Sequence, residues 1–289
     1  MLYLEKFLFP GEEAEHAFFM GQKLNCYTSY YPFQILAPRG FRRMDFEPIT
    51  ILSGSNGSGK STALSVIAEK LRLTRNSAFN QTSFYPAYVD LCVDYRSKAT
   101  PSQSRILTSD DVFDYMLDMR NINQNIDTHR EGVFEEYFTL KKSGKYSDFT
   151  MKTMDDYDTV KKLLRARSVT VSKFTRETLP ANVRTHSNGE TALRFFTEKI
   201  KDGGLYLLDE PENSLSPGKQ RELAAFLEES ARFFDCQFII STHSVFLLGI
   251  RNAKIYDLDE NPVDVKPWIE LAVSRAYYDF FRERSDEFE

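Results

Sequence analysis

The fold of this chain is decided by the stretch Gly54-Ser55-Asn56-Gly57-Ser58-Gly59-Lys60-Ser61-Thr62. An apolar, β-branched run at 48–53 precedes it and predicts a buried strand. Apolar residues recur at helical spacing through 62–73, immediately after it. A strand, a glycine-rich loop and a helix in that order are the context in which Gly-x4-Gly-Lys-Ser indicates a phosphate-binding loop.

The residue types of this loop fit an anion. Glycines allow consecutive backbone N–H groups to turn toward one phosphate at the positive end of a helix dipole. Lys60 adds a mobile positive charge for the terminal phosphates, and the hydroxyl of Ser61 is a ligand suited to Mg²⁺. A Gly/Ser-rich turn before a helix is the alternative interpretation, but it does not require the strand, the lysine and the helix together.

Composition limits the classes of protein to consider. The chain has 289 residues, 42% of them hydrophobic, which suffices for one large or two ordinary domains. Its formal net charge of −5 gives no global attraction to nucleic acid. Three widely spaced cysteines fit free thiols in a reducing compartment. With neither an apolar run of about 18 residues nor a signal-peptide core, we expect a cytoplasmic protein without membrane insertion.

The first half of the chain combines short strands with a helical insertion. We expect strands at 2–8, 33–37 and 84–95. Tyr31 could stack on adenine, although sheet packing is the commoner role of such a residue. Arg39, Arg42 and Arg43 form a basic turn for which solvent exposure is the default interpretation. The helical, charged pattern from 108 to about 167 predicts an inserted subdomain too short for long coiled-coil arms.

A locally basic stretch at 161–184 closes that insertion. It could contact nucleic acid. A solvated helix face, or charge directed at a nucleotide or partner subunit, is the favoured interpretation.

The second half alternates strands and helices. Apolar runs at 205–210 and 236–241 predict strands buried on both faces, a further strand is expected at 253–258, and 268–284 predicts a terminal helix. This alternation predicts an α/β fold with a largely parallel sheet. Because sites in such sheets lie at the carboxyl ends of the strands, we expect the loop at Gly54, the pair Asp209-Glu210 and His243 to meet at one edge.

Two adjacent carboxylates at the end of a buried strand are unfavourable unless a cation or a chemical role retains them. Asp209 is the expected partner of Mg²⁺ together with Ser61, and Glu210 is positioned to polarise an attacking water. His243 could contact the γ-phosphate. Ser187-Asn188-Gly189-Glu190 has the pattern of a capping box at a helix start.

Taken in order, the loop at 54–62, the stretch 187–190, Leu207-Leu208-Asp209-Glu210-Pro211 and Ser241-Thr242-His243 resemble the ATP-binding-cassette (ABC) ATPases. The sequence around Asp209 is most similar to that of small bacterial ATPases related to the chromosome-maintenance and overcoming-lysogenisation-defect ATPases. The resemblance implies a P-loop NTPase of ABC type, with a mostly parallel central sheet, an N-terminal antiparallel β portion and an inserted helical subdomain. Within one ATPase domain over 1–289, it implies a sheet and loop lobe at 1–103, the insertion at 104–187 and a signature lobe at 188–289.

The resemblance also implies a mechanism. Two subunits would enclose two ATP molecules head to tail, with Ser187 and Gly189 of one subunit on the γ-phosphate held by the other. Lys60, Glu210 and His243 would be catalytic. Gln103 would join Ser61 and Asp209 around Mg²⁺ and water, with Gln81 as the alternative glutamine.

Asn188 and Glu190 depart from the glycine and glutamine usual in transporter signatures, and His186 stands in place of the usual leucine. The sequence therefore favours a Mg²⁺-dependent ATPase whose ATP-driven open and closed states control an unidentified protein partner. A nucleic-acid-processing or phage-defence ATPase acting with a nuclease or toxin is the alternative. The ATP-binding subunit of a membrane transporter, which would need a separate membrane protein, is less favoured.

Overall fold

The computed structural model describes residues 2–22, 27–142, 162, 164–179 and 188–288. The chain divides into two compact units. The first comprises Met1–Phe113 and Ser187–Glu289, and the second comprises Asp114–His186. Each unit is described by itself.

The first unit contains a six-stranded sheet in the order β5-β6-β7-β3-β8-β9. Five neighbouring strands of this sheet are parallel, and the last strand, β9, pairs with β8 in the antiparallel sense. The central strands are buried along their length because both faces of the sheet are covered. The α/β fold with a mostly parallel sheet is thereby confirmed. The strand bounds are β3 (Ile49–Ser53), β5 (Arg105–Thr108), β6 (Leu205–Asp209), β7 (Gln237–Ser241), β8 (Lys254–Asp257) and β9 (Asp264–Val265).

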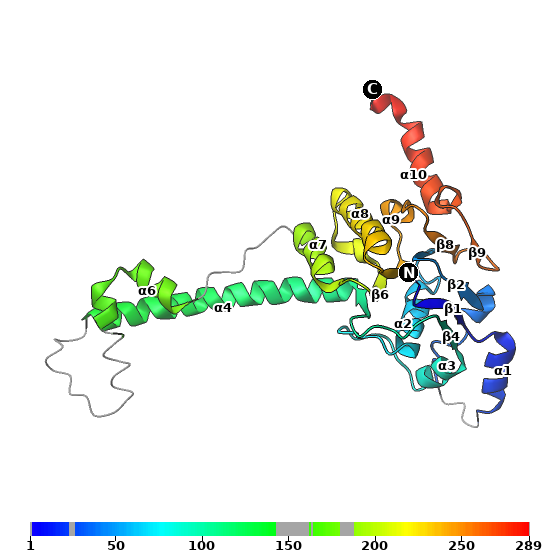
Figure 1. The fold of residues 1–289 in the computed structure, drawn as a ribbon, viewed down its shortest axis with the longest axis horizontal. Coiled ribbons are helices and arrows are strands. Elements are labelled where there is room, and N and C mark those ends of the chain that lie inside the picture. The colour runs from blue at the N-terminus through cyan, green and yellow to red at the C-terminus, as the bar shows by residue number, and fades with distance from the viewer. Residues whose placement is uncertain (1, 23–26, 143–161, 163, 180–187, 289) are drawn as a thin grey trace. The chain divides into compact units, whose positions relative to one another are not determined.

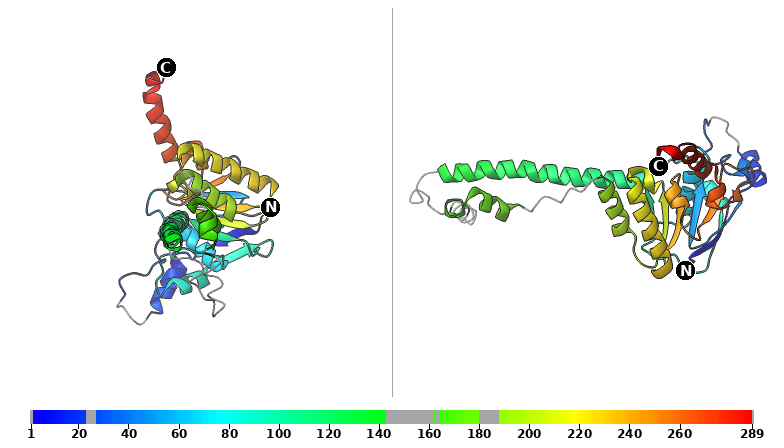
Figure 2. Two further views of the ribbon diagram at one scale, coloured as in Figure 1. Left: turned by 90° about the vertical axis from the view of Figure 1, so that its left-hand side faces the viewer. Right: turned by 90° about the horizontal axis from the view of Figure 1, so that it is seen from above.

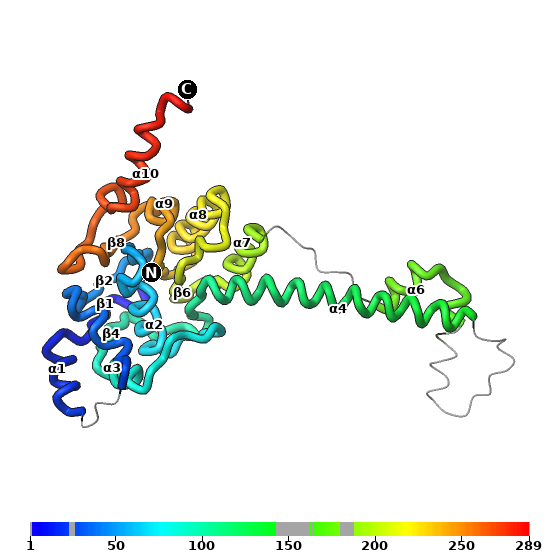
Figure 3. Tube along the Cα trace, turned by 180° about the vertical axis from the view of Figure 1, so that it is seen from behind, coloured from blue at the N-terminus to red at the C-terminus, as the bar shows by residue number. Residues whose placement is uncertain are grey.

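A smaller antiparallel sheet of order β2-β1-β4 forms the N-terminal β portion. Its strands are β1 (Leu4–Leu8), β2 (Arg43–Asp45) and β4 (Val93–Arg96), which lie side by side in the view from behind (Figure 3). Helix α1 (Glu12–Met20) follows β1.

Helix α2 (Lys60–Lys70) is buried around most of its circumference. Its apolar residues share one core cluster with side chains of both sheets, which explains why its sequence is apolar on more than one face. Three further helices, α7 (Asn188–Lys199), α8 (Pro217–Phe233) and α9 (Val245–Leu248), pack together beside the main sheet (Figure 1). Beyond η4 (Trp268–Glu270), α10 (Ala272–Glu283) extends away from both sheets (Figure 2) and is followed by η5 (Ser285–Glu287).

Two predicted strands are wrong. Residues 33–37 form turns leading into the short helix η1 (Ala37–Arg39), which has proline in its first positions. Most of 84–95 is helix α3 (Tyr85–Leu91), and only its end becomes β4. The buried residues of α3 are Tyr85, Tyr88 and Val89, a spacing of three and four that is helical, and Pro86 is tolerated because it lies in the first turn.

The second unit has a small core of its own. Val133 and Tyr137 on α4 (Ser109–Lys142) pack with Ala166 and with Phe174 on α6 (Val171–Thr178). The start of α4 lies in the first unit. The first turn of α4 is acidic, and the Asp111 carboxylate accepts a hydrogen bond of 2.8 Å from the Thr108 backbone N–H.

Part of the basic charge at 161–184 is paired within this unit. Lys162 lies 2.9 Å from Glu136, and Arg165 makes two hydrogen bonds to Glu177. This pairing reduces the positive charge that these two residues offer to an external anion. Lys161 and Arg184 lie outside the described residues.

Glu15 provides a test of the first unit's packing. Its carboxyl is buried at 4% exposure. One oxygen accepts a hydrogen bond of 2.9 Å from Gln34 N, and the other has no partner among the described residues. Burial raises the pKa of Glu15. The unfolded chain therefore releases this proton at lower pH than the folded protein does, so the free energy of unfolding falls as pH rises above about 4.5.

We expect Glu15→Gln to raise the free energy of unfolding at neutral pH by about 1 kcal/mol, because the amide removes a buried negative charge while its oxygen can still accept the hydrogen bond from Gln34 N. The gain should shrink as pH falls, because protonation removes the same charge from the wild-type protein. Thermal unfolding at several pH values measures the difference, with the exposed Glu13→Gln on the same helix as the control. A gain that is constant with pH, or a loss at neutral pH, would contradict this assignment.

Candidate nucleotide-binding site

The glycine loop turns from β3 into α2 in a conformation that requires glycine. Gly57 and Gly59 have φ of +80° and +100°, in the left-handed region. At Gly59 a side chain would also bring its Cβ within 2.8 Å of Leu36 Cδ2. The first helical residue is Lys60, so the N–H groups of the first turn of α2 face the hollow inside the loop.

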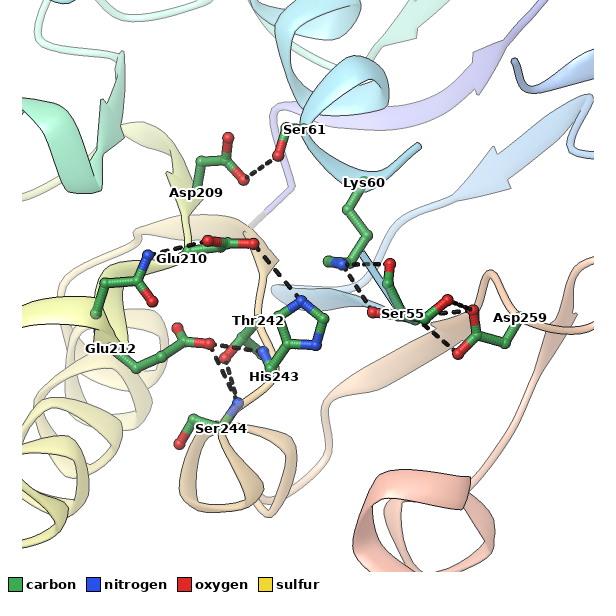
Figure 4. A network of polar contacts seen from close by, with 12 residues as sticks. Ser55, Lys60, Ser61, Asp209, Glu210, Glu212, Thr242, His243, Ser244 and Asp259 are labelled. Carbon is green, nitrogen blue, oxygen red and sulfur yellow. Dashed lines mark hydrogen bonds and ion pairs between the residues drawn. The ribbon is translucent and has the colours of Figure 1, made fainter. Parts of the chain in front are cut away.

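Lys60 lies at the centre of that hollow (Figure 4). Its side chain is buried, and Nζ donates hydrogen bonds of 2.7 and 3.1 Å to the carbonyl oxygens of Gly54 and Ser55. Burial lowers the pKa of Lys60, and the nearby carboxylates, Glu210 first, act against that shift. A phosphate would supply the negative charge that two carbonyl oxygens match only in part.

The site lies in an open hollow of about 390 Å³. Three residues of the loop, Gly54, Ser55 and Ser58, do not line it, and Ser58 is fully buried. Tyr31 donates a hydrogen bond of 3.3 Å to Thr62 Oγ1. The residues that line the hollow are Asn56, Gly57, Gly59, Lys60, Ser61, Thr62 and Glu210.

Strand register brings the acidic pair to the loop. Asp209 is the last residue of β6 and lies opposite Thr108 of β5 and Ser241 of β7. Ser61 Oγ donates a hydrogen bond of 3.0 Å to Asp209 Oδ1 across the gap between α2 and β6 (Figure 4). Burial raises the pKa of Asp209, against the effect of the Ser241 and Ser61 hydroxyls. This desolvated carboxylate is therefore in a position that a cation would stabilise.

The donor set fits Mg²⁺ bound together with a nucleotide. A serine hydroxyl and a carboxylate are oxygen donors of the type Mg²⁺ prefers, and Mg²⁺ in phosphate-transfer sites takes further ligands from phosphates and water. Among the described residues there is no group of three or more His, Cys, Asp and Glu side chains suited to a metal ion. The protein atoms alone would therefore make an incomplete site.

Glu210 occupies a strained position directly after β6. Its backbone is left-handed, with φ +48° and ψ +53°, which is uncommon for a residue other than glycine. This turn carries the side chain out of the strand direction. One carboxylate oxygen accepts a hydrogen bond of 2.9 Å from Asn213, and the other lies 3.6 Å from His243 Nε2. The structure thus brings together the residues predicted to act on water and on the γ-phosphate.

Glu212 links the two loops on which Glu210 and His243 lie, a connection that the sequence analysis did not identify. It belongs to the short helix η3 (Pro211–Ser214). Its buried carboxylate accepts backbone N–H bonds from His243 at 2.6 Å and from Ser244 at 3.2 Å (Figure 4). Glu212 therefore fixes the backbone from which the His243 side chain extends.

The expected role of Gln103 as the glutamine near Mg²⁺ is wrong. Gln103 precedes β5, at the amino end of the strand, and its amide donates to the Asp202 and Gly203 carbonyl oxygens at 2.9 and 2.7 Å. It is therefore at the opposite edge of the sheet from Asp209 and does not reach the site. The residue beside Asp209 at the carboxyl end of β5 is Thr108. Gln81 lines a different cavity, of about 600 Å³, whose lining includes none of residues 54–62.

The default interpretation of Arg39 as a solvent-exposed residue is also wrong, because its guanidinium contacts the loop. Nη1 donates to the Leu258 carbonyl oxygen at 2.8 Å and Nη2 to that of Gly57 at 3.4 Å.

Gly189 lies in the first turn of α7. Ser187, predicted to act with it, is outside the described residues.

One family model matches the chain, over residues 170–249, and is described as "AAA domain, putative AbiEii toxin, Type IV TA system". No curated protein matches the chain at a significant level. Among the described residues, no helix has the length and apolar character needed to cross a bilayer.

Solved structures match the chain at low sequence identity and with low TM-scores. An Smc head domain with an extended coiled coil, bound to the C-terminal domain of ScpA and derived from Pyrococcus furiosus, is 14% identical with a TM-score of 0.44, covering 98% of this chain and 100% of that one. An Smc head domain from Thermotoga maritima is 12% identical with a TM-score of 0.37, covering 92% and 99%. An ATP-binding cassette dimer in a post-hydrolysis state, bound to ADP and phosphate, is 12% identical with a TM-score of 0.35, covering 78% and 88%.

The glycine loop after β3, the parallel sheet and the acidic pair at the end of β6 have the arrangement of a P-loop nucleotide-binding fold. The segment that matches the AAA-domain model carries Gly189, Asp209, Glu210 and His243.

Proposed function

We propose that this protein is a Mg²⁺-dependent ATPase whose site is built from the glycine loop, Asp209 and Glu210. The observation that carries the proposal is the 3.0 Å contact between Ser61 and the half-buried Asp209 carboxylate, which joins the loop to the acidic strand end. Lys60 is buried beside them, and its hydrogen-bond partners within the described ranges are carbonyl oxygens, so the hollow holds a positive charge for an anion.

Each residue of the site has a role that follows from its position. The backbone of the loop and Lys60 bind and orient the phosphates, which supplies much of the catalysis because phosphoryl transfer depends on positioning and charge stabilisation. Ser61 and Asp209 would hold Mg²⁺, which when bound neutralises charge on the phosphate oxygens. Glu210 accepts a hydrogen bond from the attacking water, and His243, 3.6 Å from it, faces the same space.

We further propose that a second copy of the chain completes the site across a head-to-tail dimer. Gly189 lies in the first turn of α7, where backbone N–H groups are without helical partners. A Cβ at Gly189 would meet its nearest neighbours at 3.6 to 3.8 Å, which is ordinary contact. Packing against these neighbours therefore does not require glycine at this position, and glycine in a helix is destabilising. Close approach of a phosphate held by another subunit would explain why glycine is present.

ATP-dependent association tests this proposal. We expect light scattering to show a shift from monomer to dimer when ATP and Mg²⁺ are added, and Gly189→Arg to abolish that shift while leaving ATP affinity within about twofold. Lys219→Ala, at a neighbouring position, is the matched control and should still dimerise. Association of Gly189→Arg at the wild-type level would remove α7 from the interface.

The family description supports a second candidate, an ATPase that acts within a toxin–antitoxin or phage-defence system. In that case expression of the wild-type chain, with its natural partner, should change bacterial growth in a manner that depends on Lys60. Identical growth with wild-type and Lys60→Ala proteins would reject this role and leave the ATPase proposal intact.

A further inference from the structure

We propose that Asp259 is a positioning residue that holds the first turn of the phosphate-binding loop through Ser55 and thereby sets the affinity for ATP. This inference rests on the proposed ATP site. It assigns a role to a segment, Leu258–Asp259, that lies nearly 200 positions after the loop in the sequence and outside the motifs that identify the class.

The contact between Asp259 and the loop is direct. The Ser55 backbone N–H lies 2.8 Å from both carboxylate oxygens, and the Ser55 hydroxyl donates a hydrogen bond of 2.6 Å to one of them (Figure 4). Ser55 is the first residue after β3 and Gly54, so this contact fixes the point at which the chain leaves the strand. The direction of the next peptide groups, including those around Gly57, follows from that point.

Asp259 is itself held in place by the sheet. Its backbone N–H donates to the Asp257 carboxylate at 3.1 Å, and Asp257 also pairs with Lys266 at 3.2 Å. The preceding Leu258 donates its N–H to the Ser53 carbonyl oxygen at 2.8 Å. The end of β8 therefore forms a rigid support for the loop, in contrast to a freely moving surface carboxylate.

Arg39 supports the same segment from the other side. Its guanidinium joins the Leu258 carbonyl oxygen to that of Gly57. The η1 segment is tied in turn to the residues after β8, since Val263 N donates to the Arg39 carbonyl oxygen at 3.0 Å. Two contacts, one at Ser55 and one at Gly57, thus hold the first half of the loop.

The charge of Asp259 alone would have the opposite effect on ATP. Burial acts to raise the pKa of Asp259, but the Ser55 hydrogen bonds, with Lys60 and Arg39 nearby, lower it overall, so the group is ionised at neutral pH. A carboxylate close to the triphosphate repels it. Removal of the side chain therefore weakens ATP binding if positioning dominates and strengthens it if repulsion dominates.

We expect Asp259→Ala to raise the Kd and KM for ATP about tenfold while changing kcat at saturating ATP by less than about twofold. Asp259→Asn keeps one acceptor oxygen for the Ser55 N–H and should lie between wild type and Asp259→Ala. The exposed Asp264→Ala removes the same charge from the neighbouring strand and should bind ATP as wild type does. Unchanged or tighter ATP binding by Asp259→Ala would overturn the inference.

A double variant identifies the residue through which Asp259 acts. Ser55→Ala removes the hydroxyl donor alone and should weaken ATP binding by a few-fold, and adding it to Asp259→Ala should have no further effect. Independent, multiplicative effects would overturn the inference, and Ser55→Ala alone provides the test if Asp259→Ala does not fold. Lys60→Ala distinguishes a failure of the proposed ATP site from a failure of the role given to Asp259. If both Lys60→Ala and Asp259→Ala leave ATP affinity unchanged, the ATP site is rejected. If Lys60→Ala weakens ATP binding and Asp259→Ala does not, the role of Asp259 alone is rejected.

Discussion

Glu210→Gln is expected to lower the rate of ATP hydrolysis by about 100-fold or more while ATP binding is retained. The amide keeps the size of the side chain and can still accept a hydrogen bond from Asn213 or water, but it does not accept a proton at neutral pH. Because Glu210 sits on a left-handed turn at the end of β6, the substitution leaves the strand and its pairing intact.

Steady-state release of phosphate measures the loss, and calorimetry with ATP and Mg²⁺ measures the retained affinity. Glu229→Gln, an exposed residue on α8, is the matched control and should hydrolyse ATP at the wild-type rate. Hydrolysis by Glu210→Gln at the wild-type rate would remove Glu210 from the reaction, and Glu212 would become the next carboxylate to test.

Lys60→Ala is expected to weaken ATP binding by about 10- to 100-fold, the range set by a charge-assisted hydrogen bond of about 1.5–3 kcal/mol. Nζ is the buried positive charge closest to the loop carbonyl oxygens, and its removal leaves the carboxylates Asp209, Glu210 and Asp259 without it. Those carboxylates then repel the phosphates. The loss should therefore be larger at low ionic strength.

Lys60→Met distinguishes the contribution of the positive charge from that of side-chain packing, because methionine fills much of the same space without the ammonium group. Calorimetric titration of ATP should show equal losses for Lys60→Met and Lys60→Ala, and no loss for the exposed Lys201→Ala at the other end of the sheet. ATP affinity unchanged in Lys60→Ala would contradict a phosphate site in this loop.

The parts of the fold that could be predicted are those in which local sequence and tertiary environment agree. The runs at 48–53, 205–210 and 236–241 are predominantly apolar, as expected of strands buried on both faces, and they contain β3, β6 and β7. The meeting of Ser61, Asp209, Glu210 and His243 followed from the rule that parallel strands end at one edge.

The errors arose where the local pattern allowed two structures. The stretch 84–95 alternates loosely and also places Tyr85, Tyr88 and Val89 at helical spacing, and burial against the core selected the helix. Gln103 was chosen by its position in the sequence, although a residue before β5 lies at the edge opposite the site.

Glu212 and Asp259 were missed for different reasons. Glu212 directly follows the quoted stretch 207–211, but its role depends on the backbone N–H groups of a loop 31 positions away, which no local pattern reveals. Asp259 could have been found, because it follows the end of β8 just as Asp209-Glu210 follow the apolar part of β6. Its partner, Ser55, is 204 positions away, so only strand order shows that the two meet.

We propose that ATP closes two copies of this chain on each other and that hydrolysis releases them. The most direct measurement is the mass in solution of Glu210→Gln with Mg²⁺ and ATP, compared with the same protein with Mg²⁺ and ADP. We predict a dimer with ATP and a monomer with ADP, and a monomer in both when Lys60→Ala is added. A monomer with saturating ATP, in a variant shown by calorimetry to bind it, would contradict the claim.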